Sequence, residues 1–345
     1  MPADVTPFDA WLATHIVGDS VAIQRLRQTI VRAARSELPV LISGPTGAGK
    51  ELVAEAIHRI SGRQGALVAV NVCALGESMF ESALFGHVRG AFTGAAGDTA
   101  GLVAEADRGT LFLDEIGALP TREQVKLLRV LETRSYRPVG GTRDRVSSFR
   151  LVTATNEDLD YAVMEGRFRG DLRHRLGRLV LHVPSLAARR EDIPLLATHF
   201  ADLPGDAASV TIESDAMALL TAYDWPGNVR ELRSLIAAAA TLSDDGRIRR
   251  SDVLAILGDA GAEALMLPLE LAVDASHARH ALREILRECR YDTTLAAERL
   301  GIHRATVYRR MRALGLSMPT SVRYGDAPGD RPAPIGATER RLSAN

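Results

Sequence analysis

This chain of 345 residues has few cysteines, few aromatic residues and no large excess of either charge. The two cysteines, Cys73 and Cys289, lie far apart with no Cys or His at metal-ligand spacing, which argues against a disulfide framework and a cysteine-based zinc site. Aromatic residues make up 5%, and Lys+Arg 42 against Asp+Glu 43 give a net charge of -1. Because there is no basic excess, any contact with nucleic acid requires local clusters of arginine or lysine.

Long apolar runs are missing as well. No stretch approaches the ~20 residues that a membrane-spanning helix needs, and residues 1–16 lack the basic start and apolar core of a secretory signal. We therefore expect a cytoplasmic protein with no membrane contact. Hydrophobic residues at 46% and charged residues at 25% are typical of a globular chain with a sizeable core.

Short apolar runs alternate with helix-length segments from Val17 to Leu186. Strand-like runs lie at Leu38–Ser43, Leu67–Val72, Thr110–Leu113, Phe149–Thr153 and Leu179–Val183. Strands separated by helices predict an α/β fold with a mostly parallel sheet and helices on both faces. Helical periodicity then predicts a smaller all-helical subdomain.

The composition divides the chain into parts with different expected roles. A stretch rich in Gly and Ala predicts a linker, and a proline-rich C-terminal stretch predicts a disordered tail. We expect, in chain order, a lead-in at 1–15, an α/β subdomain at 16–188, a helical subdomain at 189–257, a linker at 258–268, a second helical domain at 269–316 and the tail at 317–345.

A glycine-rich stretch has the G-x-x-x-x-G-K form between an apolar strand and an amphipathic helix. It consists of Gly44, Pro45, Thr46, Gly47, Ala48, Gly49 and Lys50. In that setting backbone N–H groups point at phosphate oxygens and the lysine reaches the terminal phosphates, so we expect ATP as cofactor. The general motif continues with Ser or Thr, whereas this chain has Glu51, and a plain glycine-rich turn is the alternative interpretation.

Two acids, Asp114 and Glu115, follow the apolar run that ends at Leu113. Ligands of open α/β sheets bind at the carboxyl ends of strands. We expect Asp114 to hold the Mg²⁺ that accompanies ATP, and Glu115 to polarise the attacking water as a general base. Paired acids can also cap a helix or face solvent. With Lys50 upstream they indicate ATP hydrolysis, and nucleotide sensing without hydrolysis stays as the lesser alternative.

A hexapeptide between these two motifs carries a family resemblance. Gly90, Ala91, Phe92, Thr93, Gly94 and Ala95, preceded by Leu84–His87, resemble the signature loop of bacterial enhancer-binding proteins. Those proteins are AAA+ ATPases that activate the sigma-54 form of RNA polymerase. Glycines around an aromatic and a hydroxyl side chain favour a mobile loop that presents Phe92 and Thr93 to a partner, here sigma-54. A flexible loop with a buried Phe is the alternative.

The resemblance runs from about Ile16 to Leu316 and implies an AAA+ P-loop fold with a helical lid. Glu51 after the lysine is what this family carries. By resemblance, Asn71 restrains the catalytic glutamate, Asn156 is the first sensor of the nucleotide, and Arg230 is the second sensor in the lid. The resemblance also assigns residues 137–141 to a second surface loop beside the signature loop.

Residues 168–176 resemble the family's arginine-finger segment. This implies that Arg169 and Arg175 reach the ATP of a neighbouring subunit in a ring, a hexamer by resemblance. Gly170 departs from the usual side chain there. On charge pattern alone, a solvated basic face would be favoured, because Arg167, Arg173 and Arg178 lie nearby.

Two short helices joined by a Gly-containing turn near Gly301 fit a helix-turn-helix. No acid occurs from His303 to Leu316, and the segment resembles a Fis-type DNA-binding domain. Candidate contacts to double-stranded DNA are His303, Arg304, Thr306, Tyr308, Arg309, Arg310 and Arg312. A helical oligomerisation hairpin is the alternative.

These features together predict a sigma-54-dependent transcriptional activator. It would bind upstream DNA as a dimer, assemble into an ATP-hydrolysing ring, and convert the closed complex of the sigma-54 RNA polymerase holoenzyme into an open one. The family's N-terminal regulatory domain has no room before Ile16, so we expect control by a regulatory protein in trans, by expression level, or none. The alternatives are a nucleotide-responsive regulator that acts by occupying DNA and, less favoured, an AAA+ remodelling chaperone.

Overall fold

The computed structural model describes residues 7–202, 210–243, 245–258, 275–289, 291–300, 307, 311 and 316. The chain forms two compact units, Met1–Leu265 and Met266–Asn345. Within the described ranges, no helix has both the length and the apolar character needed to cross a membrane.

A five-stranded parallel sheet is the centre of the first unit, with strand order β2-β5-β8-β1-β9. Its strands are β1 (Val40–Ser43), β2 (Leu67–Asn71), β5 (Thr110–Asp114), β8 (Arg150–Thr155) and β9 (Leu179–His182). The five predicted strands and their parallel arrangement are confirmed, with only small shifts at the ends. Because β8 lies between β1 and β5, the carboxyl ends of these three strands are neighbours.

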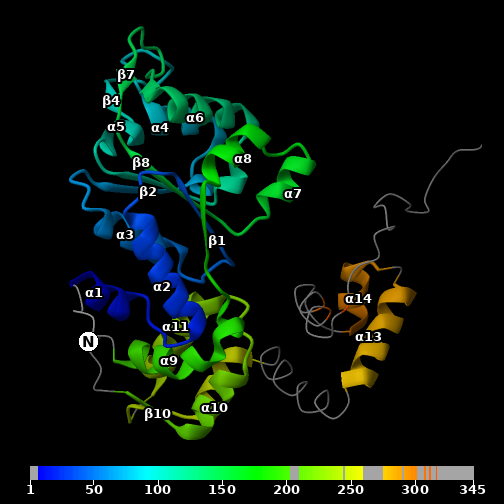
Figure 1. Cartoon of the computed structure of the whole chain (residues 1–345). Helices are drawn as coiled ribbons and strands as arrows, with labels where there is room; N and C mark the ends of the chain where they lie inside the picture. The colour runs from blue at the N-terminus through cyan, green and yellow to red at the C-terminus, as the bar shows by residue number, and fades with distance from the viewer. Residues whose placement is uncertain are drawn as a thin grey trace, which may run out of the picture. The chain divides into compact units, whose positions relative to one another are not determined.

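Helices cover both faces of the sheet, because alternate strand residues point to opposite sides. In β5, Phe112 packs with the helices of one face, whereas Leu111 and Leu113 pack with those of the other. The first face carries α1 (Pro7–His15), α2 (Val21–Ala34) and α3 (Lys50–Ser61). The second carries α4 (Glu77–Phe85), α5 (Leu102–Glu105), α6 (Thr121–Thr133), α7 (Leu159–Met164) and α8 (Gly170–Leu176) (Figure 1).

Two short hairpins lie beside α4 and α6 (Figure 1). One pairs β3 (Gly86–His87) with β4 (Thr99–Ala100), and the other pairs β6 (Ser135–Tyr136) with β7 (Arg145–Val146). A bridge between His87 and Val139 joins the first hairpin to the loop of the second. Short 3-10 turns follow two sheet strands, η1 (Val72–Ala74) and η2 (Ile116–Ala118).

A helical lid follows β9. It contains η3 (Leu186–Asp192), α9 (Ile193–Ala201), α10 (Ser214–Ala222), α11 (Asn228–Leu242) and a helical run at 250–258. Its core is built around Trp225, which is 1% exposed and donates its indole N–H to the Leu220 carbonyl at 2.8 Å. The lid is not entirely helical, because β10 (Thr211–Ile212) and β11 (Arg247–Ile248) form a two-residue parallel ladder.

The second unit contains α13 (Ala275–Glu288) and α14 (Thr293–Leu300). Its small core combines one stripe of α13 with residues of α14 and beyond, namely Leu282, Leu286, Cys289, Ala296, Val307 and Met311. The candidate DNA contacts from His303 to Arg312 lie outside the described residues, as do 259–268 of the predicted linker and the predicted tail.

Candidate nucleotide-binding site

The predicted phosphate loop connects β1 to α3. Gly47 and Gly49 have φ angles of 74° and 106°, a left-handed conformation that favours glycine. Gly49 is the N-cap of α3, so the first free N–H groups of this helix lie at the loop. A helix N-terminus that follows a wrapped glycine loop is suited to bind phosphate.

Lys50, the first residue of α3, is 7% exposed and is held inside this loop. Its Nζ donates to the Gly44 carbonyl at 3.1 Å and to the Pro45 carbonyl at 3.4 Å. The same ammonium lies 3.6 Å from the Glu115 carboxylate. The lysine therefore joins the phosphate loop to the predicted general base.

The residues after β5 and β8 complete this cluster. Glu115 has a φ of 54° and donates its backbone N–H to the Asp114 carboxylate at 3.0 Å. Its own carboxylate accepts from the Asn156 backbone at 3.3 Å, and the Asn156 side chain donates to the Thr46 hydroxyl at 2.8 Å. A left-handed glutamate costs about 1 kcal/mol or more, and such strain concentrates at functional sites.

Asn71 ends β2 and is the register partner of Asp114. Its side-chain oxygen accepts from the Cys73 backbone at 2.9 Å, which starts η1. Within the described part of the chain, Glu115 pairs with Lys50 and Asn156 rather than with Asn71. The restraint of Glu115 by Asn71 stays a prediction.

The lid binds three consecutive carbonyl groups of the phosphate loop. The Asn228 amide donates to the Thr46 carbonyl at 3.0 Å, and the Arg230 backbone N–H donates to Gly47 at 3.2 Å. Arg189 donates to the Ala48 carbonyl at 3.2 Å, and burial lowers the pKa of its guanidinium. The Gly44 and Ala48 N–H groups donate to the Thr155 and Pro45 carbonyls, so the N–H groups of Thr46, Gly47 and Gly49 remain for an anion.

Two of these lid contacts were missed by the sequence analysis. Asn228, 3% exposed, also accepts from the Leu186 backbone at 2.8 Å, and Arg189 is equally buried at 3%. The only sequence signal for Asn228 is its place after a Pro-Gly pair. The close approach also requires Gly47, because a Cβ there would lie 2.2 Å from the Gly227 carbonyl. The side chain of Arg230 is exposed, and its role as the second sensor stays a prediction.

Replacement of Asn228 by alanine is expected to weaken ATP binding about tenfold. It removes the hydrogen bond that joins the lid to the Thr46 carbonyl of the loop and the one from the Leu186 backbone that orders the lid itself, each contributing ~1 kcal/mol. The measurement is the dissociation constant of a fluorescent ATP analogue. Asn228→Gly, which relieves the left-handed φ of 55°, should lose the same affinity. Wild-type affinity in both variants, with Ser234→Ala as control on α11, would show that this contact does not support the loop.

Arg169 and Arg175 lie at the two ends of α8, and neither side chain bonds to a described residue of the phosphate loop. Arg169 forms an ion pair with Asp171 at 2.7 Å, and this hydrogen bond lowers the pKa of the Asp171 carboxyl. Arg175 donates to the Leu131 carbonyl at 3.1 Å. The role of both side chains as arginine fingers stays a prediction.

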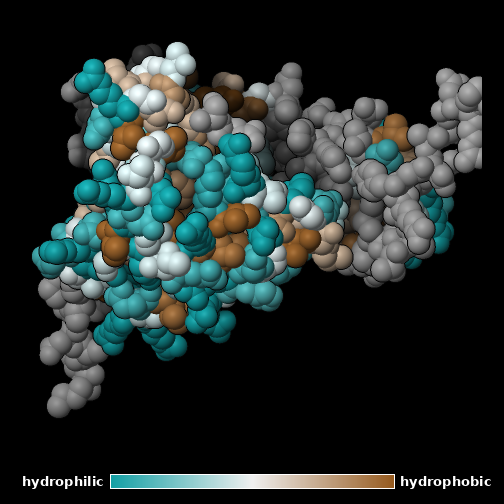
Figure 2. All heavy atoms as spheres, turned by 90° about the horizontal axis from the view of Figure 1, so that it is seen from above, coloured by the Kyte–Doolittle hydropathy of each residue, from teal (hydrophilic) through white to brown (hydrophobic). Residues whose placement is uncertain are grey.

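The signature hexapeptide forms the turn between β3 and β4. Thr93 is exposed, whereas Phe92 is 38% exposed and rests edge-on against His87, with ring centroids 5.0 Å apart. His87 is held by the Ser82 hydroxyl at 2.8 Å and the Thr99 hydroxyl at 3.3 Å. No sequence motif indicated this support for Phe92. Figure 2 shows the domain from above, a mostly hydrophilic surface with separate hydrophobic patches.

The strand that carries Asn156 separates the strand of the phosphate loop from the strand of the acid pair, and a helical lid closes on the loop. This arrangement defines the AAA+ class of P-loop nucleotide-binding proteins. Family models agree along the chain: a sigma-54 interaction domain matches residues 16–182, an AAA+ ATPase lid domain 187–264, and a bacterial regulatory protein of the Fis family 279–314. The chain therefore belongs to the bacterial enhancer-binding proteins, with a C-terminal helix-turn-helix.

Similar proteins support this assignment. The transcriptional regulator VasH of Vibrio cholerae is 48% identical over 239 residues, 68% of this chain and 45% of VasH. The anaerobic nitric oxide reductase transcription regulator NorR of Escherichia coli O139:H28 is 42% identical over 331 residues, 92% of this chain and 66% of NorR. The chain thus spans about half to two thirds of these relatives. A structure of NtrX from Brucella abortus in complex with ADP is 34% identical, covers 89% of this chain and 72% of NtrX, and has a TM-score of 0.65.

Proposed function

We propose that this chain hydrolyses ATP and uses the energy to activate sigma-54 RNA polymerase from an upstream DNA site. The observation that carries the proposal is that one domain holds both a candidate hydrolysis site and the candidate loop for contact with sigma-54. The Lys50–Glu115–Asn156 cluster lies at the phosphate loop, and the intact signature loop of residues 90–95 lies on the same domain.

Hydrolysis follows from the geometry of the cluster. Lys50 moves from Glu115 to the terminal phosphates of ATP, and Glu115 then accepts a proton from the attacking water. Asn156, placed between Thr46 and Glu115, orients that water. The half-buried Asp114 carboxylate, the Thr46 hydroxyl and phosphate oxygens are a donor set that suits Mg²⁺, which would neutralise developing phosphate charge.

Assembly completes the site. Arg169 and Arg175 bond to Asp171 and to the Leu131 carbonyl rather than to their own phosphate loop, and they stabilise transition-state charge on ATP held by a neighbouring copy. This requires a ring, a hexamer by family resemblance, formed from dimers on DNA.

Coupling to sigma-54 goes through the signature loop. Phe92 and Thr93 contact sigma-54 when the loop extends, and the second loop moves with it. Val88 N–H donates to the Val139 carbonyl at 3.1 Å, and Val139 N–H donates to Gly86 at 2.9 Å. The two loops therefore form one mechanical unit.

The second unit binds double-stranded DNA through the helix-turn-helix, with contacts from the basic residues between His303 and Arg312. The NorR and VasH relatives are transcription regulators by name, which supports a DNA-directed role. A regulatory protein in trans is the proposed input.

Removal of residues 269–345 separates this function from its rivals. We expect loss of site-specific DNA binding in a gel-shift assay, whereas ATP-dependent transcription by sigma-54 holoenzyme persists when the truncated protein is supplied at high concentration. A chaperone would retain all its activity after the truncation. A regulator that acts by occupancy would give no sigma-54 transcription in either form, which would contradict the proposal.

A further inference from the structure

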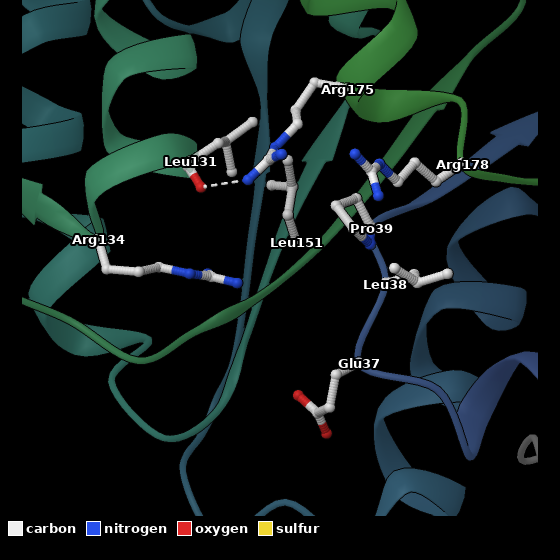
Figure 3. A pocket seen from close by; sticks show the side chains of 8 residues that line it. All are labelled: Glu37, Leu38, Pro39, Leu131, Arg134, Leu151, Arg175 and Arg178. Carbon is white, nitrogen blue, oxygen red and sulfur yellow. Dashed lines mark hydrogen bonds between the residues drawn. The ribbon is translucent and has the colours of Figure 1, made fainter.

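A pocket of about 130 Å³ lies at the end of the sheet opposite the phosphate loop (Figure 3). Pro39 directly precedes β1, Leu151 is at the start of β8, and Arg178 directly precedes β9. The amino ends of parallel strands lie at the same end of the sheet, and the phosphate loop follows the carboxyl end of β1. The length of β1 therefore separates this pocket from the chain's own phosphate loop. Four strand residues span ~13 Å, beyond the reach of a nucleotide phosphate bound at that loop.

Three arginines face this pocket. In Figure 3, Arg134 and Arg178 extend into it from opposite sides, and Arg175 lies between them. Arg175 is tethered to the Leu131 carbonyl at 3.1 Å, and Arg134 to the Phe149 carbonyl at 2.7 Å. The guanidinium of Arg178 has no hydrogen bond or ion pair to any other described residue.

Negative charge in the pocket is small by comparison. Among the described lining residues Glu37 is the single acid, and its carboxylate is already paired with Arg63 at 2.5 Å. Burial and, after it, the repulsion from Arg175 lower the pKa of Arg134. The planar guanidinium groups suit phosphate oxygens, which they bind in pairs of hydrogen bonds.

We propose that Arg134, Arg175 and Arg178 form an anion pocket for the terminal phosphate of ATP held by a neighbouring copy, with Arg178 as a further residue acting in trans. The inference rests on the proposed ATPase function and adds residues to its shared site. Arg134 and Arg175 are fixed by backbone carbonyls and shape the pocket. Arg178 is free to close on the incoming phosphate.

The test begins with ATP hydrolysis by Arg178→Ala at protein concentrations that support assembly. We expect kcat to fall about tenfold, because an exposed and therefore screened charge is lost from a site where a central finger contributes 10³-fold or more. The dissociation constant for ATP should stay unchanged, since each copy keeps its own loop. Arg25→Ala, an exposed arginine on α2, is the matched control and should behave as wild type.

Mixing subunits distinguishes action in trans from a structural effect. Arg178→Ala keeps an intact phosphate loop and Glu115, whereas Glu115→Gln is inactive but keeps the arginine pocket. An equal mixture should raise hydrolysis per Arg178→Ala subunit severalfold. No increase on mixing, or wild-type kcat in Arg178→Ala alone, would overturn the inference.

Further outcomes show whether the inference or the proposed function fails. Loss of hydrolysis in Arg175→Ala with full activity in Arg178→Ala would overturn this inference and leave the proposed function standing. Full activity in Arg175→Ala would remove the shared site itself. Binding of inorganic phosphate to isolated wild-type subunits, lost in Arg178→Ala and without complementation, would assign the pocket to free phosphate and overturn its role between copies.

Discussion

Glu115→Gln is expected to lower kcat for ATP hydrolysis by about 10²–10⁴-fold, the contribution of a positioned general base. The amide can still accept the Asn156 N–H but cannot take a proton from water. ATP should bind no more weakly than to wild type, because the change also removes the carboxylate that pairs with Lys50 at 3.6 Å. Single-turnover hydrolysis and a binding titration measure the two effects separately.

Glu105→Gln, an exposed glutamate on α5, serves as the control for Glu115 and should hydrolyse ATP as wild type does. Hydrolysis by Glu115→Gln at more than about a tenth of the wild-type rate would be inconsistent with a general base at this position. The acid pair would then need another role.

Thr93→Ala is expected to reduce sigma-54-dependent transcription about thirtyfold or more, the effect of losing a contact worth ~2 kcal/mol at the centre of an interface. Thr93 is exposed and lies far from the phosphate loop in sequence. Because surface substitutions usually change stability by less than ~0.5 kcal/mol, the variant should keep its fold. ATP turnover should therefore stay within about twofold of wild type. Promoter-specific transcription and phosphate release, measured in the same reaction, separate the two activities.

Thr241→Ala on α11 removes a comparable exposed hydroxyl and should leave both activities intact. If Thr93→Ala activates transcription normally, the coupling role of the signature loop is wrong. A parallel loss of ATP turnover would instead place Thr93 in the hydrolysis cycle.

The sheet and the phosphate site were predictable because their signals are local. Apolar runs of strand length mark β1, β5 and β8, and the G-x-x-x-x-G-K spacing determines where Lys50 lies relative to the loop. The carboxyl ends of parallel strands meet at one edge, which explains why Glu115 and Asn156 come together from separate parts of the sequence.

The lid contacts were not predictable in the same way. Asn228 meets Thr46 across 182 positions, and Arg189 meets Ala48 across 141, so no local period reports either pairing. The β10–β11 ladder is only two residues per strand, too short for an alternating pattern. Phe92 packs on His87 because the chain between them folds back as a hairpin. The glycine-rich sequence of this hairpin has no periodic pattern that would predict the contact.

The most direct test is promoter melting in a purified system. Sigma-54 holoenzyme is placed on a sigma-54 promoter with this protein at a concentration high enough to bypass upstream DNA binding. Single-stranded DNA in the promoter is then detected with a reagent specific for unpaired thymine. We expect melting with ATP and none with a non-hydrolysable analogue. Measurable ATP turnover without melting would contradict it and favour a regulator that acts by occupying DNA.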